Sequence, residues 1–245
     1  MPGTVDPVDA ALREAAAVGP FFALCPEGRP FDQGRLPLAH VYSAPEGPLV
    51  ARIDAVAAAL RTGDRRVAAS IAFQGLAARL WSVALGAAVL GERLPDLGPE
   101  RLRWNPARTA PDDLWLPTPR QAARDDGDLP AALRSAVLHG HLLPLHRATI
   151  AVCSVSSRVL WGNAASALVG SLRVLHGWCR TAGRPRAADR ALSLCRSVLD
   201  DPLMRETGTL HEDAGAPAFV RRGCCLYYRV PGGGLCGDCV LAHCR

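Results

Sequence analysis

The sequence predicts an α+β fold that is predominantly α-helical, with a small antiparallel sheet and a cysteine-rich C-terminal segment. Apolar residues recur at helical spacing over most of the chain, most clearly in residues 64–90 and 129–199. Between residues 94 and 120, six prolines exclude long helices, and two short stretches alternate apolar and polar residues as strands do. Five of the nine cysteines lie between Cys224 and Cys244.

The first 90 residues predict three helices, with a connector between the first and the second. Residues 6–18 form a short amphipathic pattern, and residues 49–61 form a second helical pattern. Between them, residues 20–47 are rich in proline and glycine, which indicates irregular structure with short strands. Asp64 is a suitable N-cap for the long apolar stretch that ends near residue 90, and the small residues of this stretch allow close packing. We therefore expect residues 64–90 to form the central core helix.

The remaining elements follow in chain order. Residues 101–104 and 114–116 predict the two strands of the small sheet, and residues 121–128 form a polar linker. The breaks at proline, glycine and asparagine predict separate helices over residues 129–142, 144–161, 164–178 and 185–199. Beyond Asp213, Gly215 and Pro217 introduce the C-terminal tail.

Length and composition predict one compact unit with three regions. A chain of 245 residues with 49% hydrophobic content is long enough to bury a sizeable core. The regions are an N-terminal helical part with the small sheet (residues 1–120), a helical part (121–213) and the C-terminal cysteine segment (214–245).

The charge pattern argues against nucleic-acid binding. All 28 basic residues are arginines, they are balanced by 23 acidic residues, and no block of like charge is present. The N-terminus lacks a basic start followed by an apolar stretch, so we expect no secretory signal and a cytoplasmic protein. Gln74 and Arg79 interrupt the most apolar stretch, so no transmembrane segment is predicted, which leaves only a peripheral membrane contact open.

The cysteines divide into two groups. Four isolated ones fall outside the tail, and most of them lie in apolar helical patterns that are typical of core residues: Cys25, Cys153, Cys179 and Cys195. In a reducing compartment, the clustered ones indicate metal ligation rather than disulfides.

The tail itself has the spacing C-C-x10-C-x2-C, formed by Cys224, Cys225, Cys236 and Cys239. Four thiolates suffice for a binuclear iron-sulfur cluster or for a tetrahedral zinc ion. Glycines between the two pairs allow the chain to reverse. The adjacent pair suits ligands that divide between two iron atoms, but spacing alone leaves both metals open.

This tail resembles the C-terminal signature of the FhuF-like ferric-siderophore reductases. Two further stretches resemble segments of that family: residues 67–75 (VAASIAFQG) with 78–81 (ARLW), and residues 160–168 (LWGNAASAL). The resemblance covers most of the chain from about residue 60 onward and matches the first 60 residues only loosely. It implies that the four cysteines bind a [2Fe-2S] cluster, so that the tail is an iron-sulfur cluster segment.

The resemblance also implies an activity: one-electron reduction of Fe(III) held by a hydroxamate or catecholate siderophore, with release of Fe(II) in the cytoplasm. Hard oxygen ligands hold Fe(III) more tightly than Fe(II), so reduction loosens the metal. The sequence contains no phosphate-binding loop and no dinucleotide fingerprint. We therefore expect an external electron donor such as a ferredoxin or a flavoprotein.

Several residues are candidates for contact with the substrate or for adjusting the cluster. Arg221, Arg222 and Arg229 place positive charge near the cysteines, where it favours cluster reduction or docks an anionic chelate. Trp104-Asn105 and Trp161 with Asn163 are candidates for lining a chelate pocket.

The histidines carry weaker hypotheses. His243 is a candidate for coupling electron uptake to proton uptake, and Cys244 for a substitute ligand. The set His139, His141 and His146 lacks carboxylates at metal-binding spacing, so we expect surface or capping residues there.

Two alternatives to the reductase remain open on the sequence. One is a zinc-stapled module that binds a siderophore or a partner without redox activity. The other is a cluster-containing redox sensor that binds a partner according to its oxidation state and does not turn over ferric chelates.

Overall fold

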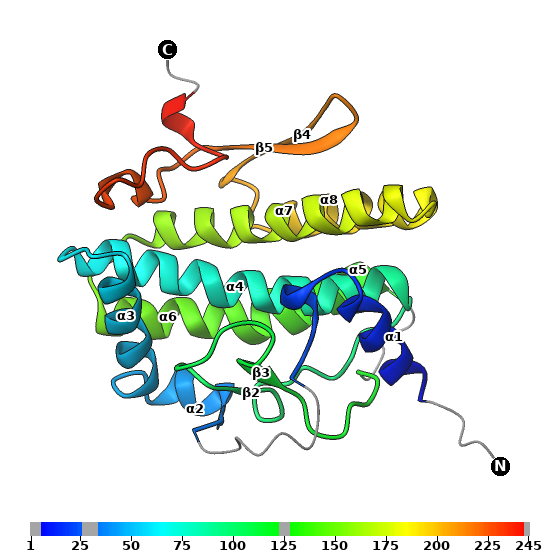
Figure 1. Ribbon diagram of the computed structural model, residues 1–245, viewed down its shortest axis with the longest axis horizontal. Coiled ribbons are helices and arrows are strands. Elements are labelled where there is room, and N and C mark those ends of the chain that lie inside the picture. The colour runs from blue at the N-terminus through cyan, green and yellow to red at the C-terminus, as the bar shows by residue number, and fades with distance from the viewer. Residues whose placement is uncertain (1–5, 26–33, 123–127, 243–245) are drawn as a thin grey trace.

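A computed structural model describes residues 6–25, 34–122 and 128–242 of the chain. It confirms a predominantly helical α+β fold with a small antiparallel sheet. The long helices form the middle of the molecule, the small sheet lies on one side of them, and the C-terminal hairpin and tail lie on the other (Figure 1).

The central element is α4 (Arg65–Leu90), as the sequence predicts. Asp64 caps it by accepting a hydrogen bond from the Arg66 amide at 3.0 Å, and the helix ends at Gly91. Its residues are buried on nearly every face. By length and composition α4 is the one described helix that would suffice to cross a membrane, but most of its apolar stretch is buried within the protein.

Helices α7 (Ser157–Thr181) and α8 (Pro185–Leu199) pack on one side of α4. Ser82 of α4 and Ser171 of α7 share a hydrogen bond of 2.8 Å at this contact. The predicted helix over residues 144–161 and the predicted break before Ala164 are wrong. The preceding helix, α6, ends at Val152, and α7 runs without interruption through Gly162 and Asn163.

The N-terminal elements cover the remaining sides of α4. Helices α1 and α3 pack directly against it, and α2 contacts α6. Their bounds are Pro7–Ala16 for α1, Pro20–Phe22 for the 3-10 turn η1, Leu38–Ser43 for α2 and Pro48–Ala59 for α3. Helix α2 lies in the stretch predicted as irregular, because its six residues are too few to show a helical period.

The small sheet has the strand order β1-β2-β3, with both pairs antiparallel. The strands are β1 (Leu36–Pro37), β2 (Arg103–Trp104) and β3 (Leu114–Trp115), so both strands predicted around the prolines are confirmed.

Residues 129–152, which lie between the sheet and α7, are helical. They form α5 (Leu129–Leu133), a π-helical stretch η2 (Arg134–Leu142) and α6 (Leu143–Val152).

A two-stranded hairpin precedes the cysteines and was not predicted. Strand β4 (Gly208–Asp213) pairs with β5 (Ala216–Arg221) in antiparallel register, from Gly208 opposite Arg221 to Asp213 opposite Ala216. The turn between the strands consists of Ala214 and Gly215, both with positive φ. Strand β5 packs on α7, so the hairpin directs the following residues onto the helical core.

Candidate metal centre

The cysteine segment begins where β5 ends and folds back on itself. The Arg221 amide donates to the Asp238 carbonyl at 3.1 Å, which returns the second half of the segment to the end of the hairpin. Cys224 and Cys225 follow Arg221 by three and four residues, and Cys239 directly follows Asp238. This backbone contact therefore brings the two cysteine pairs to the same end of the hairpin.

The reversal between the two pairs depends on left-handed backbone conformations. Leu226 has φ +69°, and it is followed by the 3-10 turn η3 (Tyr227–Arg229). Gly232 and Gly234 both have φ +73°, a region in which glycine is favoured because it has no Cβ. The glycine-rich turn predicted from the sequence is therefore present. A second 3-10 turn, η4 (Val240–Ala242), follows the last cysteine.

None of the four cysteines forms a disulfide, and they differ in burial. Cys225 and Cys239 are 4% and 3% exposed, whereas Cys224 and Cys236 are partly exposed. Backbone amides point at two of the sulfurs: the Leu226 amide donates to Cys224 Sγ and the Tyr227 amide to Cys225 Sγ, both at 3.4 Å. Amide donors of this kind stabilise a thiolate and are among the groups that set the potential of an iron-sulfur cluster.

Cys225 and Cys236 form a hydrogen-bonded pair that joins the two halves of the segment. Hydrogen bonding from the Cys236 thiol, together with the Tyr227 amide and the Arg221 charge, lowers the pKa of Cys225 to about 6. The same contact raises the pKa of Cys236, because Cys236 keeps the shared proton. Cys225 is thus the thiolate of the pair, and thiolate is the form that binds metal.

Polar side chains of α4 and α7 hold the segment on the helical core. Ser70 of α4 donates through Oγ to the Cys225 carbonyl at 3.1 Å. Asn163 of α7 donates through Nδ2 to the Ser70 carbonyl at 2.8 Å. Sequence reasoning missed Ser70; the signal was a polar residue inside an otherwise apolar core helix.

Arg221 lies beneath the segment and is 2% exposed. Its Nε donates to the Gly223 carbonyl at 2.9 Å, its Nη2 to Asn163 Oδ1 at 2.7 Å and its Nη1 to Ser166 Oγ at 3.3 Å. A Cβ at Gly162 would lie 2.7 Å from Nη2, so only glycine leaves room there for the guanidinium. This burial differs from the expectation that Arg221 contacts a substrate, because its side chain does not reach the surface.

Arg222 and Arg229 are exposed, and each has a carboxylate partner. Arg222 pairs with Glu206, and Arg229 pairs with Asp64 at 3.2 Å. Arg66 pairs with the same Asp64 at 3.0 Å, and the hydrogen bond from Arg66 is the largest cause that lowers the pKa of Asp64 to about 2. The three arginines that the sequence groups together therefore differ in burial and in charge compensation.

The predicted pocket residues separate into two places. Trp104 belongs to β2 of the small sheet and Asn105 directly follows it, and this sheet lies across the long helices from the cysteine segment (Figure 1). Asn163 is buried and accepts a hydrogen bond from Arg221. Trp161 is partly buried and stacks on His146, with 4.7 Å between the ring centroids. The structure thus brings Trp161 and Asn163 near the cysteines and leaves Trp104 and Asn105 apart from them.

The three histidines do not converge, and two of them correct the sequence expectation. His146 is buried in α6, and its Nε2 contacts Ser157 Oγ at 2.7 Å. His141 is fully buried rather than a surface or capping residue: it contacts Tyr42 Oη at 2.8 Å and the Leu97 carbonyl at 2.6 Å. His139 is exposed and pairs with Asp201. His243 and Cys244 lie outside the described residues.

A pocket of about 380 Å³ adjoins the first cysteine pair. Gly223, which precedes Cys224, forms part of its wall, and Arg158, Trp161, Glu206 and Arg222 contribute side chains. Because the lining contains two guanidinium groups and one carboxylate, the pocket has a net positive charge. Arg158 also fixes the segment, by donating to the Arg222 carbonyl at 3.0 Å.

The donor set fits an iron-sulfur cluster in its chemistry. It supplies four cysteine sulfurs that form no disulfide, amide donors at two of these sulfurs and a buried positive charge beside them. Within residues 6–25, 34–122 and 128–242, no three His, Cys, Asp or Glu side chains are gathered closely enough to hold one metal ion. Cys225 and Cys236 are in contact across the two pairs.

Comparison with known proteins gives one family. Residues 221–241 match the family model described as the FhuF 2Fe-2S C-terminal domain, and this match contains all four cysteines. No curated protein matches the chain. The match agrees with the resemblance noted from the sequence and indicates a [2Fe-2S] cluster as the cofactor.

Proposed function

We propose that this protein is a cytoplasmic ferric-siderophore reductase. The observation that carries the proposal is the match of residues 221–241 to the FhuF 2Fe-2S C-terminal domain, which contains the four cysteines at the end of the hairpin. Cys224, Cys225, Cys236 and Cys239 would hold the cluster, which supplies one-electron chemistry when bound.

The reaction is a change in the oxidation state of the substrate iron. Fe(III) in a hydroxamate or catecholate chelate accepts one electron and becomes Fe(II), and an external donor protein replaces that electron. Hard oxygen ligands bind Fe(II) less tightly than Fe(III), so the chelate then releases its metal. No bond of the organic ligand needs to break.

The burial of the cysteines suits electron transfer at a surface. Cys225 and Cys239 are buried against the core, whereas Cys224 and Cys236 are partly exposed. Three large apolar side chains of the same segment are also exposed, namely Tyr228, Leu235 and Leu241. They provide apolar contact area for a chelate or a donor protein.

The pocket beside Cys224 supports docking of an anionic chelate. Arg158 and Arg222 attract negative charge, and Trp161 offers an aromatic surface. A volume of about 380 Å³ is suited to one arm of a siderophore. We therefore propose Trp161 and Arg222 as substrate contacts.

The proposal is tested by mixing the anaerobically reduced protein with ferric hydroxamate and ferric catecholate chelates in a stopped-flow instrument. We expect reoxidation of the protein together with capture of Fe(II) by a ferrous trap. Reoxidation by oxygen alone, with no trapped Fe(II), would contradict the reductase.

A pair of variants tests the pocket. Arg222→Gln removes one positive charge from it, so we expect the second-order rate constant with an anionic chelate to fall several-fold and to depend less on salt. Arg196→Gln is the matched control, because Arg196 is also exposed and also pairs with a glutamate, Glu212, but lies on α8. Equal effects of the two substitutions would argue against docking in the pocket.

A further inference from the structure

Arg221 is a buried charge whose contacts are all neutral. Its nitrogens donate to a carbonyl, an amide oxygen and a hydroxyl, those of Gly223, Asn163 and Ser166. Throughout the described part of the chain, no carboxylate forms an ion pair with it. A buried charge without a counter-charge is costly, so a group that compensates it is expected nearby.

The other buried arginine shows the usual arrangement. Arg79 is 2% exposed, as Arg221 is, but its Nε donates to Asp113 Oδ1 at 2.8 Å. Burial of a guanidinium in this protein is therefore accompanied by a carboxylate at one site and not at the other.

The carboxylates around the cysteine segment are engaged elsewhere. Asp238 accepts a hydrogen bond from Arg173 at 2.6 Å, Glu206 pairs with Arg222, and Asp64 pairs with Arg229. Each of these acids is matched by a different arginine, which leaves the Arg221 charge in excess.

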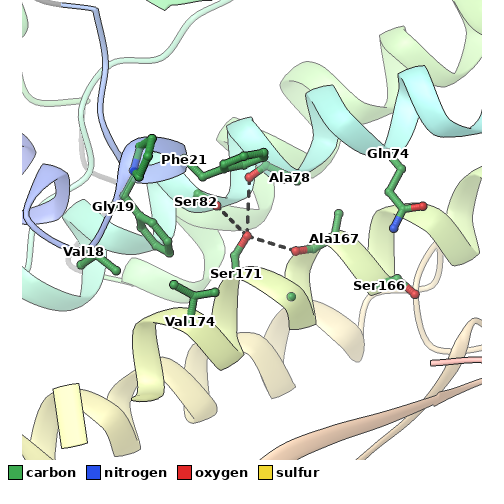
Figure 2. A pocket seen from close by; sticks show the side chains of 13 residues that line it. Val18, Gly19, Phe21, Gln74, Ala78, Ser82, Ser166, Ala167, Ser171 and Val174 are labelled. Atoms are coloured by element: carbon green, nitrogen blue, oxygen red, sulfur yellow. Dashed lines mark hydrogen bonds between the residues drawn. The ribbon is translucent and has the colours of Figure 1, made fainter. Parts of the chain in front are cut away.

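The far side of Arg221 offers no anion either. Ser166, which Arg221 contacts, also lines a cavity of about 360 Å³ between η1, α4 and α7 (Figure 2). None of the residues that line this cavity is charged. Figure 2 shows Ser171 directed at Ser82 and at the carbonyls of Ala78 and Ala167, so its hydroxyl is already used.

The remaining neighbour is the cysteine segment. Arg221 donates through Nε to the carbonyl that precedes Cys224 and through its backbone amide to the carbonyl that precedes Cys239. Asn163, which accepts from Arg221, also donates to Ser70, and Ser70 donates to the Cys225 carbonyl. Arg221 is thus connected to the backbone next to three of the four ligand positions: through its guanidinium to Gly223, through Asn163 and Ser70 to Cys225, and through its own backbone amide to Asp238.

We propose that Arg221 is the internal counter-cation of the [2Fe-2S] cluster, positioned by Asn163 and Gly162, and that it raises the reduction potential of the cluster. This inference rests on the cofactor of the proposed function. A binuclear cluster on four thiolates carries a charge of about −2, and reduction makes it one unit more negative. A fixed positive charge in a buried site therefore stabilises the reduced form more than the oxidised form.

The test measures the midpoint potential of the purified, cluster-loaded protein by following the visible absorption during a redox titration. Arg221→Met removes the charge, and we expect a shift to more negative potential. Arg221→Lys keeps the charge, so we expect its midpoint potential to lie close to the wild-type value. Arg229→Gln is the control, because Arg229 is exposed and paired with Asp64, so its loss should shift the potential less.

A second variant makes the test independent of the Arg221 substitution. Asn163→Asp leaves Arg221 in place and supplies the carboxylate that it lacks, so it should also lower the potential. If the Arg221→Met protein does not take up iron and sulfide, the midpoint potential of the Asn163→Asp protein tests the inference instead. A wild-type potential in loaded Arg221→Met or in Asn163→Asp would overturn the inference. A loaded wild-type protein that fails to reduce ferric chelates would instead contradict the proposed function and leave this test valid.

Discussion

At the scale of single residues, the cysteine segment is organised by contacts that a spacing pattern does not contain. The motif identifies Cys224, Cys225, Cys236 and Cys239, but it does not show that Cys225 is the thiolate of a pair with Cys236. Nor does it separate Arg221 from the neighbouring arginines, because burial depends on where α7 lies. The cysteine motif was thus visible in the sequence. The burial of Arg221 and the contact of Cys225 with Cys236 were seen only in the structure.

Cys236→Ser should abolish or greatly weaken cluster binding, because it removes one of four thiolate ligands. The measurement is the visible absorption of anaerobically purified protein. Cys153→Ser is the matched control, since Cys153 is a cysteine outside the segment, and its spectrum should be that of the wild type. An unchanged spectrum in Cys236→Ser would show that the ligand set is wrong.

Gly162→Ala should lower the free energy of unfolding by about 1–3 kcal/mol, because the added Cβ displaces Arg221 Nη2 from Asn163 Oδ1. Gly177→Ala on the same helix has nothing within 4 Å of its new Cβ, so it should stabilise by about 0.5–1 kcal/mol. Urea unfolding measures both. Destabilisation by both substitutions to the same extent would contradict the steric account.

At the scale of elements, long patterns were predictable and short or interrupted ones were not. Helix α4 and its cap follow from a long apolar pattern after Asp64. The uninterrupted α7 was missed because Gly162 and Asn163 look like a helix break in sequence, although their contacts with Arg221 account for them. The β4–β5 hairpin was missed because most of β4 is exposed and lacks a clear apolar alternation.

The π-helical stretch η2 contains a buried histidine that predicts a pH dependence. Burial is the main cause that lowers the pKa of His141 to about 4. Below about pH 6.5 the unfolded chain binds a proton at this side chain and the folded protein does not, so stability falls as the pH drops. We expect a loss of about 2 kcal/mol between pH 7 and pH 5 from this group.

Urea unfolding at several pH values measures this loss. In His141→Gln, the free energy of unfolding should depend less on pH between pH 6.5 and pH 4. In His139→Gln it should depend on pH as in the wild type, because His139 is exposed. The same slope in His141→Gln as in the wild type would contradict the assignment to His141.

At the scale of the whole molecule, the long helices separate two faces. The small sheet with Trp104 and Asn105 lies on one side, and the hairpin with the cysteine segment lies on the other (Figure 1). The sequence predicted the small sheet and the cysteine segment but not the hairpin. It could not tell which residues share a face, because that depends on how α4 and α7 pack. The consequence for function is that the cysteines, the positive pocket and Arg221 form one region supported by α4 and α7.

The most direct test is the metal content of protein purified without oxygen. If the four cysteines hold a [2Fe-2S] cluster, iron and inorganic sulfide will be present in equal amounts, about two of each per chain. Zinc in their place, or no metal in folded protein, would contradict the account.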